Sequence, residues 1–405
     1  MRTPLQLIIV LAALLLGSGL LLGTSLVVDT PAAHAQTTLT PGPCGEQGTL
    51  SSEVAQGTLP SGALYLICVP PQTEWNGDLV VYAHGYTPVT APLGFQNLVL
   101  PDGSYLPDLV LGQGYAFATT SYRQNGLAIL EGAEDIRELI ARFAQVNNGQ
   151  SAKHTYLTGV SEGALITTLL TERSSDQFSG GLAACGPIGS FRRQINYFGD
   201  FRVLFDYFFP GVLPGSPIDI PNYVIANWKS TYVPAIEQAL ADHPLRTAQL
   251  MSTFIGSSGA PLDLSNPATW KPATINLLWY NVFATNDAQQ KLGGNPFDNS
   301  NRVYRGSAND RRLNKYVQRF RADEIALQHL APYETSGQVK RPLVTIHTTG
   351  DEIIPYWQER RYLAKVQTSG QGRVTPIPIL RYGHCNFRSK EVLASFDLLV
   401  WQVNQ

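Results

Sequence analysis

The sequence predicts an α/β protein with a mostly parallel central sheet, helices on both faces and an inserted, mainly helical cap. Short apolar runs alternate with helix-like stretches from Cys44 to Pro187, and apolar runs typical of strands return at 343–347 and 374–380. Strands that alternate with helices form parallel sheets covered on both faces. The pattern stops over 188–338, which is far longer than an ordinary connection. We therefore expect a two-part core, at 36–187 and 339–405, and a cap at 188–338.

The elements of the first core part follow from their apolar spacing. Apolar runs at 62–68, 78–83 and 115–121 predict strands. A helix is expected near 127–146, where apolar residues recur at helical spacing; they are Ile129, Ala133, Ile136, Ile140 and Phe143. Ligands of parallel sheets bind at the carboxyl ends of the strands. The residues that follow each strand are therefore the candidates for a site.

The most informative segment is Gly159-Val160-Ser161-Glu162-Gly163, a G-x-S-x-G pattern. It follows an apolar run at 155–158 and precedes a helix-like stretch at 164–170. The two glycines permit a sharp strand-to-helix turn that projects the serine away from the sheet. A serine hydroxyl becomes a nucleophile when a base holds it and oxyanion donors face it. Ser161 is the candidate nucleophile, and an ordinary turn serine is the alternative.

Two later strands each lead into a candidate partner for Ser161. The apolar run at 343–347 precedes the loop of Asp351, and the run at 374–380 precedes the loop of His384. The chain order for this class of site is serine, acid, histidine. His384 is the only histidine after Asp351, so this order makes it the base. A structural loop histidine is the alternative.

The oxyanion donors should come from an earlier strand end. The run at 78–83 leads into His84-Gly85-Tyr86. The backbone N–H of Tyr86, paired with that of Glu162, is the candidate donor pair. The Glu162 side chain has a structural explanation, because acidic residues in the first helical turn contribute roughly 0.3–1 kcal/mol. A substrate-facing carboxylate is the alternative, and it would disfavour anionic substrates.

These four elements, in this order and each at a strand end, resemble the α/β-hydrolase superfamily. Within it, the chain looks like a secreted esterase or lipase with a large helical cap. The resemblance covers roughly residues 60–187 and 340–405 and leaves the middle uncovered. It implies a triad of Ser161, Asp351 and His384 and an acyl-enzyme mechanism without a cofactor.

The resemblance also bears on the choice of acid. Asp351 as a helix N-cap for the stretch beginning at Pro355, with Glu352 as the acid, is the alternative assignment. We favour Asp351 because Gly-Asp-x-x-Ile-Pro matches the superfamily pattern for the acid.

Aromatic residues supply the candidate pocket walls. Tyr86, Tyr356 and Phe387 flank the three loops of the site. The start of the cap is also aromatic, with Tyr197, Phe198, Phe201, Phe205, Tyr207, Phe208 and Phe209. Two interpretations of these residues stay open. They form the packing interface between cap and core, or they form a hydrophobic subsite for an acyl or aromatic group. Helices within the cap are expected at 232–245 and 314–331.

The four cysteines are Cys44, Cys68, Cys185 and Cys385. An even count in an exported chain favours disulfides, and four cysteines allow three pairings. We expect Cys44–Cys68 to tie the N-terminal part to the first strand, and Cys185–Cys385 to steady the loop of the candidate base. Incomplete pairing is the alternative. Some secreted esterases place paired cysteines beside both the nucleophile and the histidine; Cys385 fits that arrangement, whereas Val160 departs from it.

Residues 1–35 have the pattern of a targeting segment. Arg2 is the only early charge, the stretch 5–28 is mostly apolar, and Ala33-His34-Ala35 fits a cleavage site before Gln36. The apolar stretch approaches the ~20 residues that span a bilayer. An uncleaved anchor, with membrane contact, is therefore the alternative to a signal peptide. Either way, we expect the globular part to be secreted or extracytoplasmic.

Charge and motifs exclude several classes of partner. The net charge is −2 and charged residues make up 15% of the chain, so attraction to nucleic acid is not expected. The sequence lacks a dinucleotide-binding glycine pattern, a P-loop and zinc-type His/Cys spacing, so we predict no cofactor and no metal. The stretch 295–301 lacks calcium-loop spacing and is interpreted as a polar turn.

The expected function is an extracytoplasmic serine hydrolase that cleaves small-molecule or polymeric carboxylic esters through an acyl-enzyme. An exopeptidase of the same fold is one alternative, with Glu162 or Glu352 holding a substrate amine. A catalytically inactive surface binding protein is the other. The intact set of triad elements argues against that second alternative.

Overall fold

The structure, a computed structural model, describes residues 38–405. The expected targeting segment at 1–35 lies outside the described residues. The described residues belong to one compact unit. Within that unit, no helix combines the length and the apolar character needed to cross a membrane.

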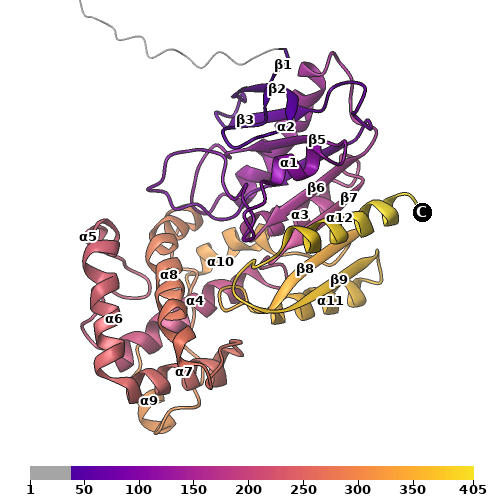
Figure 1. Ribbon diagram of the computed structural model, residues 1–405. Helices are drawn as coiled ribbons and strands as arrows, with labels where there is room; N and C mark the ends of the chain where they lie inside the picture. The colour runs from indigo at the N-terminus through magenta and orange to yellow at the C-terminus, as the bar shows by residue number, and fades with distance from the viewer. Residues whose placement is uncertain (1–37) are drawn as a thin grey trace, which may run out of the picture. The chain divides into compact units, whose positions relative to one another are not determined.

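A mixed sheet forms the centre of the fold, with the strand order β1-β2-β3-β5-β4-β6-β7-β8-β9 over the described chain (Figure 1). Strands β1, β2, β3 and β5 pair antiparallel in turn, and every later pair is parallel. The predicted mostly parallel sheet is confirmed. The strands are β1 Thr40–Pro43, β2 Ser51–Thr58, β3 Leu64–Val69, β4 Leu79–Ala83, β5 Ala116–Thr120, β6 Thr155–Val160, β7 Gly180–Ala184, β8 Leu343–Gly350 and β9 Val374–Tyr382.

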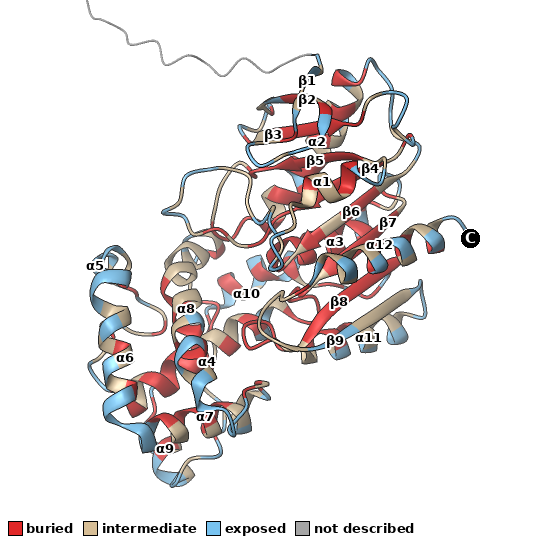
Figure 2. Ribbon diagram, viewed as in Figure 1, coloured by how far each residue is buried: buried red, intermediate tan, exposed pale blue. Residues whose placement is uncertain are grey.

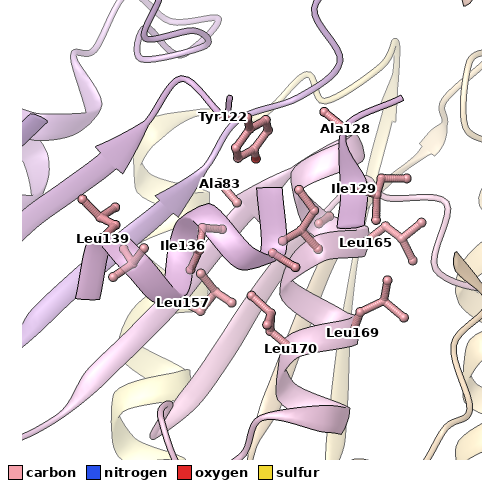
Figure 3. Packing of buried hydrophobic residues seen from close by; sticks show 14 of the residues in the cluster. Ala83, Tyr122, Ala128, Ile129, Ile136, Leu139, Leu157, Leu165, Leu169 and Leu170 are labelled. Carbon is pink, nitrogen blue, oxygen red and sulfur yellow. The ribbon is translucent and has the colours of Figure 1, made fainter. Parts of the chain in front are cut away.

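Five α-helices flank this sheet: α1 Leu106–Leu111, α2 Ile129–Val146, α3 Glu162–Arg173, α11 Trp357–Ser369 and α12 Ser389–Val403. One apolar cluster joins the sheet to α2, α3 and α11 through residues such as Ile136, Leu165 and Tyr362. Figure 3 shows Ile136 and Leu139 of α2 facing Leu157 of the sheet. A separate cluster joins the opposite face to α1 and α12 through Val110 and Leu399. The sheet therefore has helices on both faces, as predicted.

The connection between β7 and β8 is helical. Its elements are α4 Phe191–Phe208, α5 Asn222–Ala226, η1 Trp228–Tyr232, α6 Val233–Asp242, α7 Pro244–Ser258, η2 Pro267–Thr269, α8 Trp270–Leu292, α9 Asp310–Tyr316, α10 Glu324–Leu330 and η3 Ala331–Tyr333. We call this segment, residues 188–338, the helical insertion. It has its own buried core around Phe201, Phe205 and Phe254, which Figure 2 shows as red inner faces of α4 and α7. Its status as a separate domain stays a prediction, because the described residues cluster as one unit.

Two helices expected in the insertion are wrong as single helices. The stretch 232–245 is divided at His243 because Pro244 restricts the residue before it, and Pro244 itself starts α7. The stretch 314–331 is divided because the backbone at Phe320 pairs with Asn299: the Phe320 N–H donates to the Asn299 side chain at 2.7 Å, and the Asn299 N–H donates to the Phe320 carbonyl at 3.1 Å. This long-range pairing outweighs local helix propensity.

Candidate active site

Ser161 lies on the sharp turn between β6 and α3. Its backbone has φ 54° and ψ −117°, a conformation that side chains rarely adopt. The two flanking glycines are required by space: a Cβ on Gly163 would lie 2.1 Å from the Ala83 carbonyl oxygen, and a Cβ on Gly159 would lie 2.2 Å from the Gly163 oxygen. The turn therefore holds the serine at the carboxyl end of β6, where a strand-to-helix elbow places it.

The structure brings Ser161, His384 and Asp351 together from three strand ends. His384 Nε2 lies 3.0 Å from Ser161 Oγ. His384 Nδ1 lies 2.7 Å from Asp351 Oδ2. The other Asp351 oxygen, Oδ1, accepts the backbone N–H groups of Ile353 and Ile354 at 2.9 and 2.8 Å. The carboxylate is thus fixed on both sides, and the imidazole spans the gap between acid and serine.

A second histidine, His347, contacts Asp351 from β8, the strand that precedes the acid in the sequence. His347 is fully buried in β8. Its Nε2 donates to the Ile354 carbonyl at 2.7 Å and lies 3.4 Å from Asp351 Oδ2, while Nδ1 lies 3.3 Å from Glu359 Oε1. Both ring nitrogens face acceptors, so both carry protons. The only signal in the sequence is a histidine four residues before the acid, which is too common to identify this role.

The two histidines set the ionisation of Asp351. Burial would raise the pKa of Asp351, yet the charge of His384 and the hydrogen bonds from both histidines hold that pKa well below its ordinary value. Burial would lower the pKa of His347, but its contacts with Asp351 and Glu359 raise it to about 10. Asp351 therefore remains an anion at neutral pH, and it fixes the His384 tautomer that carries the proton on Nδ1.

The turn after β4 lies against the serine. A Cβ added to Gly85 would be 3.2 Å from Ser161 Cβ. Asn97, which the sequence analysis missed, accepts the Gly85 N–H on Oδ1 at 3.0 Å and so orients this turn. Glu162 is the first residue of α3, where backbone N–H groups have no partner within the helix. The pairing of its N–H with that of Tyr86 as oxyanion donors stays a prediction.

Two aromatic side chains hold this turn in place. His84 is buried and stacks on Tyr122, with ring centroids 4.0 Å apart, which agrees with a structural role. The Tyr86 hydroxyl donates to the Phe283 carbonyl of α8 at 3.0 Å, and its ring meets Trp279 edge-on. The candidate oxyanion turn is therefore tied to the helical insertion.

The Glu162 side chain is turned away from the serine. Its Oε1 accepts the Ala128 N–H, just before α2, at 3.0 Å, and burial raises the pKa of the carboxyl to about 8. It is not among the residues that line the cavity at Ser161. This position favours the structural explanation of Glu162 over the substrate-facing one.

Replacing Glu162 by glutamine should make stability less sensitive to alkaline pH. Between the ordinary pKa of 4.5 and the folded value of about 8, the unfolded chain loses a proton that the folded chain keeps. Stability therefore falls as pH rises through this window, by at most ~1.4 kcal/mol per pH unit. Glutamine does not ionise and still accepts the Ala128 N–H. Urea unfolding at pH 5, 7 and 9 should show a smaller decline for E162Q than for the wild type or for E134Q, an exposed control. An equal decline of stability with pH in E162Q and in the wild type would contradict the raised pKa of Glu162.

Both expected disulfides are present. Cys44 pairs with Cys68, and Cys185 pairs with Cys385. The second pair joins the residue after β7 to the residue after His384, and Cys385 Sγ lies 3.3 Å from His384 Nε2. Among the described residues, this trio of Cys185, His384 and Cys385 is also the group with metal-ligand spacing. Its sulfurs are bonded to each other and so are not thiolate donors.

A cavity of about 300 Å³ opens at Ser161. Tyr86 and Phe387, two of the three predicted pocket residues, line it. Tyr356, the third, lies apart from it and packs edge-on against His347 at 5.7 Å. Tyr280 of the insertion, one of the cap aromatics for which the sequence left packing and a hydrophobic subsite both open, also lines the cavity.

A scan against protein-family models finds no match, and a search of curated proteins also finds none. Solved structures with a similar chain path include Candida antarctica lipase A, at 17% identity and a TM-score of 0.45, over 89% of this chain and 81% of that one. The rice cell wall degrading esterase LipA from Xanthomonas oryzae matches at 14% identity and a TM-score of 0.45, over 92% and 98%. Pyrococcus horikoshii acylaminoacyl peptidase matches at 14% and 0.41, over 91% of this chain. The present chain spans 42% of the length of that peptidase.

Because these identities and TM-scores are low, the fold is assigned from the geometry of the chain itself. A mostly parallel sheet, in which β3 at an inner position and β1 at the edge run antiparallel to the other strands, carries the serine on an elbow between β6 and α3. The acid follows β8 and the histidine follows β9, in the order typical of nucleophile-elbow enzymes. The chain therefore has the α/β-hydrolase fold.

Proposed function

We propose that the protein is a serine hydrolase that cleaves carboxylic esters through an acyl-enzyme. The observation that carries this proposal is the continuous hydrogen-bonded line from Ser161 Oγ through His384 to Asp351, with separations of 3.0 and 2.7 Å. Hydrogen-bond reach between nucleophile, base and orienting acid is the geometric signature of covalent acyl transfer.

In the proposed reaction, Ser161 Oγ attacks the ester carbonyl carbon while His384 Nε2 takes the hydroxyl proton. The carbonyl oxygen becomes an oxyanion, which accepts hydrogen bonds from the Tyr86 and Glu162 N–H groups. The C–O bond to the alcohol then breaks, and His384 returns its proton to the departing alkoxide. Water next attacks the acyl-enzyme with His384 as base, which releases the carboxylic acid and restores Ser161. Asp351 stabilises the imidazolium in both halves of the cycle.

One observation keeps an exopeptidase as the second candidate. Glu352 lies next to Asp351, and its buried Oε2 has no hydrogen-bond partner among the described residues. Burial raises the pKa of this carboxyl. A substrate amine could pair with this oxygen only if it reached past the lining of the cavity at Ser161, which does not include Glu352. Glu162, the other candidate for that role, is already used by the Ala128 N–H.

We also propose that the protein works outside the cytoplasm, because two disulfides are formed and such bonds persist in oxidising compartments. The helical insertion would act as the cap over the site. This assignment is supported by Tyr280, which lines the cavity at Ser161, and by the bond from Tyr86 to α8.

The test is hydrolysis of p-nitrophenyl esters from acetate to palmitate, and of amino-acid arylamides, by protein that starts at Gln36. A fluorophosphonate probe is applied in parallel. Ester turnover with labelling of Ser161 is the expected result. Turnover of arylamides alone would replace the esterase by the peptidase. An absence of both turnover and labelling would overturn the enzyme proposal and favour a binding protein.

Removing the Cys185–Cys385 bond should impair both stability and turnover. The bond closes a loop of 200 residues, and cross-links of long loops contribute roughly 2–5 kcal/mol. It also restrains the His384 loop, so a double alanine variant should lose about tenfold in kcat. The matched control is a double alanine variant at Cys44 and Cys68, a bond away from the site, which should lose stability but keep kcat. Equal kcat in both variants would contradict the positioning role.

A further inference from the structure

The centre of the sheet is uncovered on one face. Thr158 and Val160 of β6 and Ala184 of β7 are only half-buried, although both strands lie inside the sheet. Val160 pairs with Ala184, so these side chains share one face, the face that also carries α1 and α12. Central strands of parallel sheets are normally covered on both faces. The two helices therefore leave a gap above β6 and β7.

The cavity that opens at Ser161 fills this gap. Ser161 and His384 lie at one part of its wall, and the side chains of Thr158, Val160 and Ala184 form its floor. Its sides are formed by α1, through Leu106, Leu109 and Val110, and by α12, through Val392, Leu393 and Phe396. The reacting serine is therefore continuous with an apolar space inside the α/β core, on the side of α1 and α12.

The wall of the cavity suits an uncharged aliphatic group. It contains no lysine, arginine, aspartate or glutamate. Its central polar groups have partners already: the Tyr82 hydroxyl donates to the Asn97 carbonyl at 2.9 Å, and the Thr158 hydroxyl donates to the Val81 carbonyl at 3.2 Å. A polar or charged substituent would lose its water without gaining hydrogen bonds. Apolar surface, in contrast, gains from leaving water.

The strand register gives the length of the cavity. Its floor reaches from Val160 back to Val80, which pairs with Tyr156, four residues earlier on β6. At ~3.3 Å per residue, this distance is about 13 Å. An extended alkyl chain, with C–C bonds of ~1.5 Å at tetrahedral angles, advances roughly 1.25 Å per carbon. The cavity therefore matches a linear chain of about ten carbons.

We propose that this cavity binds the acyl chain of the substrate and that the protein prefers linear medium-chain acyl esters. This inference rests on the proposed ester hydrolysis at Ser161. The acyl carbon bonds to Ser161 Oγ, so a chain attached to it enters the cavity where the serine opens into it. The acyl subsite then lies between α1 and α12 of the core, and the aromatic residues that begin the helical insertion, in α4, serve packing.

The test compares two leucines on α12. Leu393 and Leu398 are both half-buried, but only Leu393 lines the cavity. For the wild type, kcat/KM should rise by up to about fourfold per methylene to a maximum near decanoate and then fall. L393W should lower kcat/KM for decanoate by at least ~10-fold and leave acetate within about twofold. L398W should keep the wild-type profile. A flat wild-type profile, or equal profiles for L393W and L398W, would overturn the proposal.

Two further measurements distinguish a failure of the acyl-subsite proposal from a failure of the esterase proposal. Alkyl acetates from ethyl to decyl vary the alcohol, and a maximum there instead of in the acyl series would overturn the acyl assignment. Calorimetric binding of decanoate to S161A and to the S161A/L393W double variant tests the cavity without turnover. Decanoate binding to S161A that L393W abolishes, without ester hydrolysis by the wild type, would uphold the cavity and refute the esterase. Ester hydrolysis by the wild type without decanoate binding to S161A would uphold the esterase and refute the acyl cavity.

Discussion

Replacing Ser161 by alanine should lower kcat for ester hydrolysis by at least ~10⁴-fold. The variant lacks the oxygen that forms the acyl-enzyme, and loss of a triad nucleophile typically costs about 10⁴–10⁶ in kcat. The residual rate should come from substrate binding and from the Tyr86 and Glu162 N–H groups. Initial rates on the best p-nitrophenyl ester, with active-site titration of the wild type by a fluorophosphonate, measure the effect.

The fold of S161A should be unchanged, which makes the loss of activity interpretable. Alanine keeps the β-carbon of serine, so the elbow at φ 54° needs no new space. Circular dichroism and the urea midpoint serve as the structural readouts. G163A is the matched control for damage to the elbow, because its Cβ would collide with the Ala83 oxygen. We expect that variant to unfold more easily. Retention of more than a tenth of the activity by S161A would place the nucleophile elsewhere.

The parts that sequence predicted well are those carried by local patterns. Apolar runs at 62–68, 78–83 and 115–121 correspond to β3, β4 and β5. The glycines around Ser161 identify the elbow because an added Cβ has no space at either position. Chain order then selects Asp351 and His384, which the structure places within hydrogen-bond reach.

The parts that sequence missed depend on residues that meet only in the folded chain. Asp351 and Glu359 stabilise the protonated form of His347, and neither contact is indicated by a sequence pattern. Strand β2 carries polar residues such as Glu53 and Gln56 because it lies near the sheet edge, so its apolar signal is weak. The gap between α1 and α12 is a property of how two helices pack, and each helix alone has an ordinary apolar face.

Replacing Asp351 by asparagine should lower kcat by about 10⁴-fold, as a wrong histidine tautomer does in a Ser-His-Asp site. The asparagine oxygen is expected to keep the Ile353 and Ile354 N–H bonds now made by Oδ1. Its NH₂ group would then face His384 Nδ1 as a donor. His384 would respond by moving its proton to Nε2, the atom that must accept the Ser161 proton.

His347 makes this substitution different from simple removal of a charge. The imidazolium of His347 lies 3.4 Å from Asp351 Oδ2 and keeps Glu359 as its remaining anion in the variant. Loss of one of two anions should lower the pKa of His347 and lower the stability of D351N at neutral pH. The change in stability is measured by urea unfolding, and the His347 pKa by NMR titration of the imidazole.

E352Q is the control that decides between the two adjacent carboxylates. His384 bonds to Asp351 and Ser161 rather than to Glu352, so kcat should fall by no more than a few fold, on the scale of a single non-catalytic contact. Similar or greater losses in E352Q than in D351N would reassign the acid to Glu352. A large loss in D351N alone fits one arrangement only: a carboxylate fixed by two backbone N–H groups and by His347 that orients the base toward Ser161.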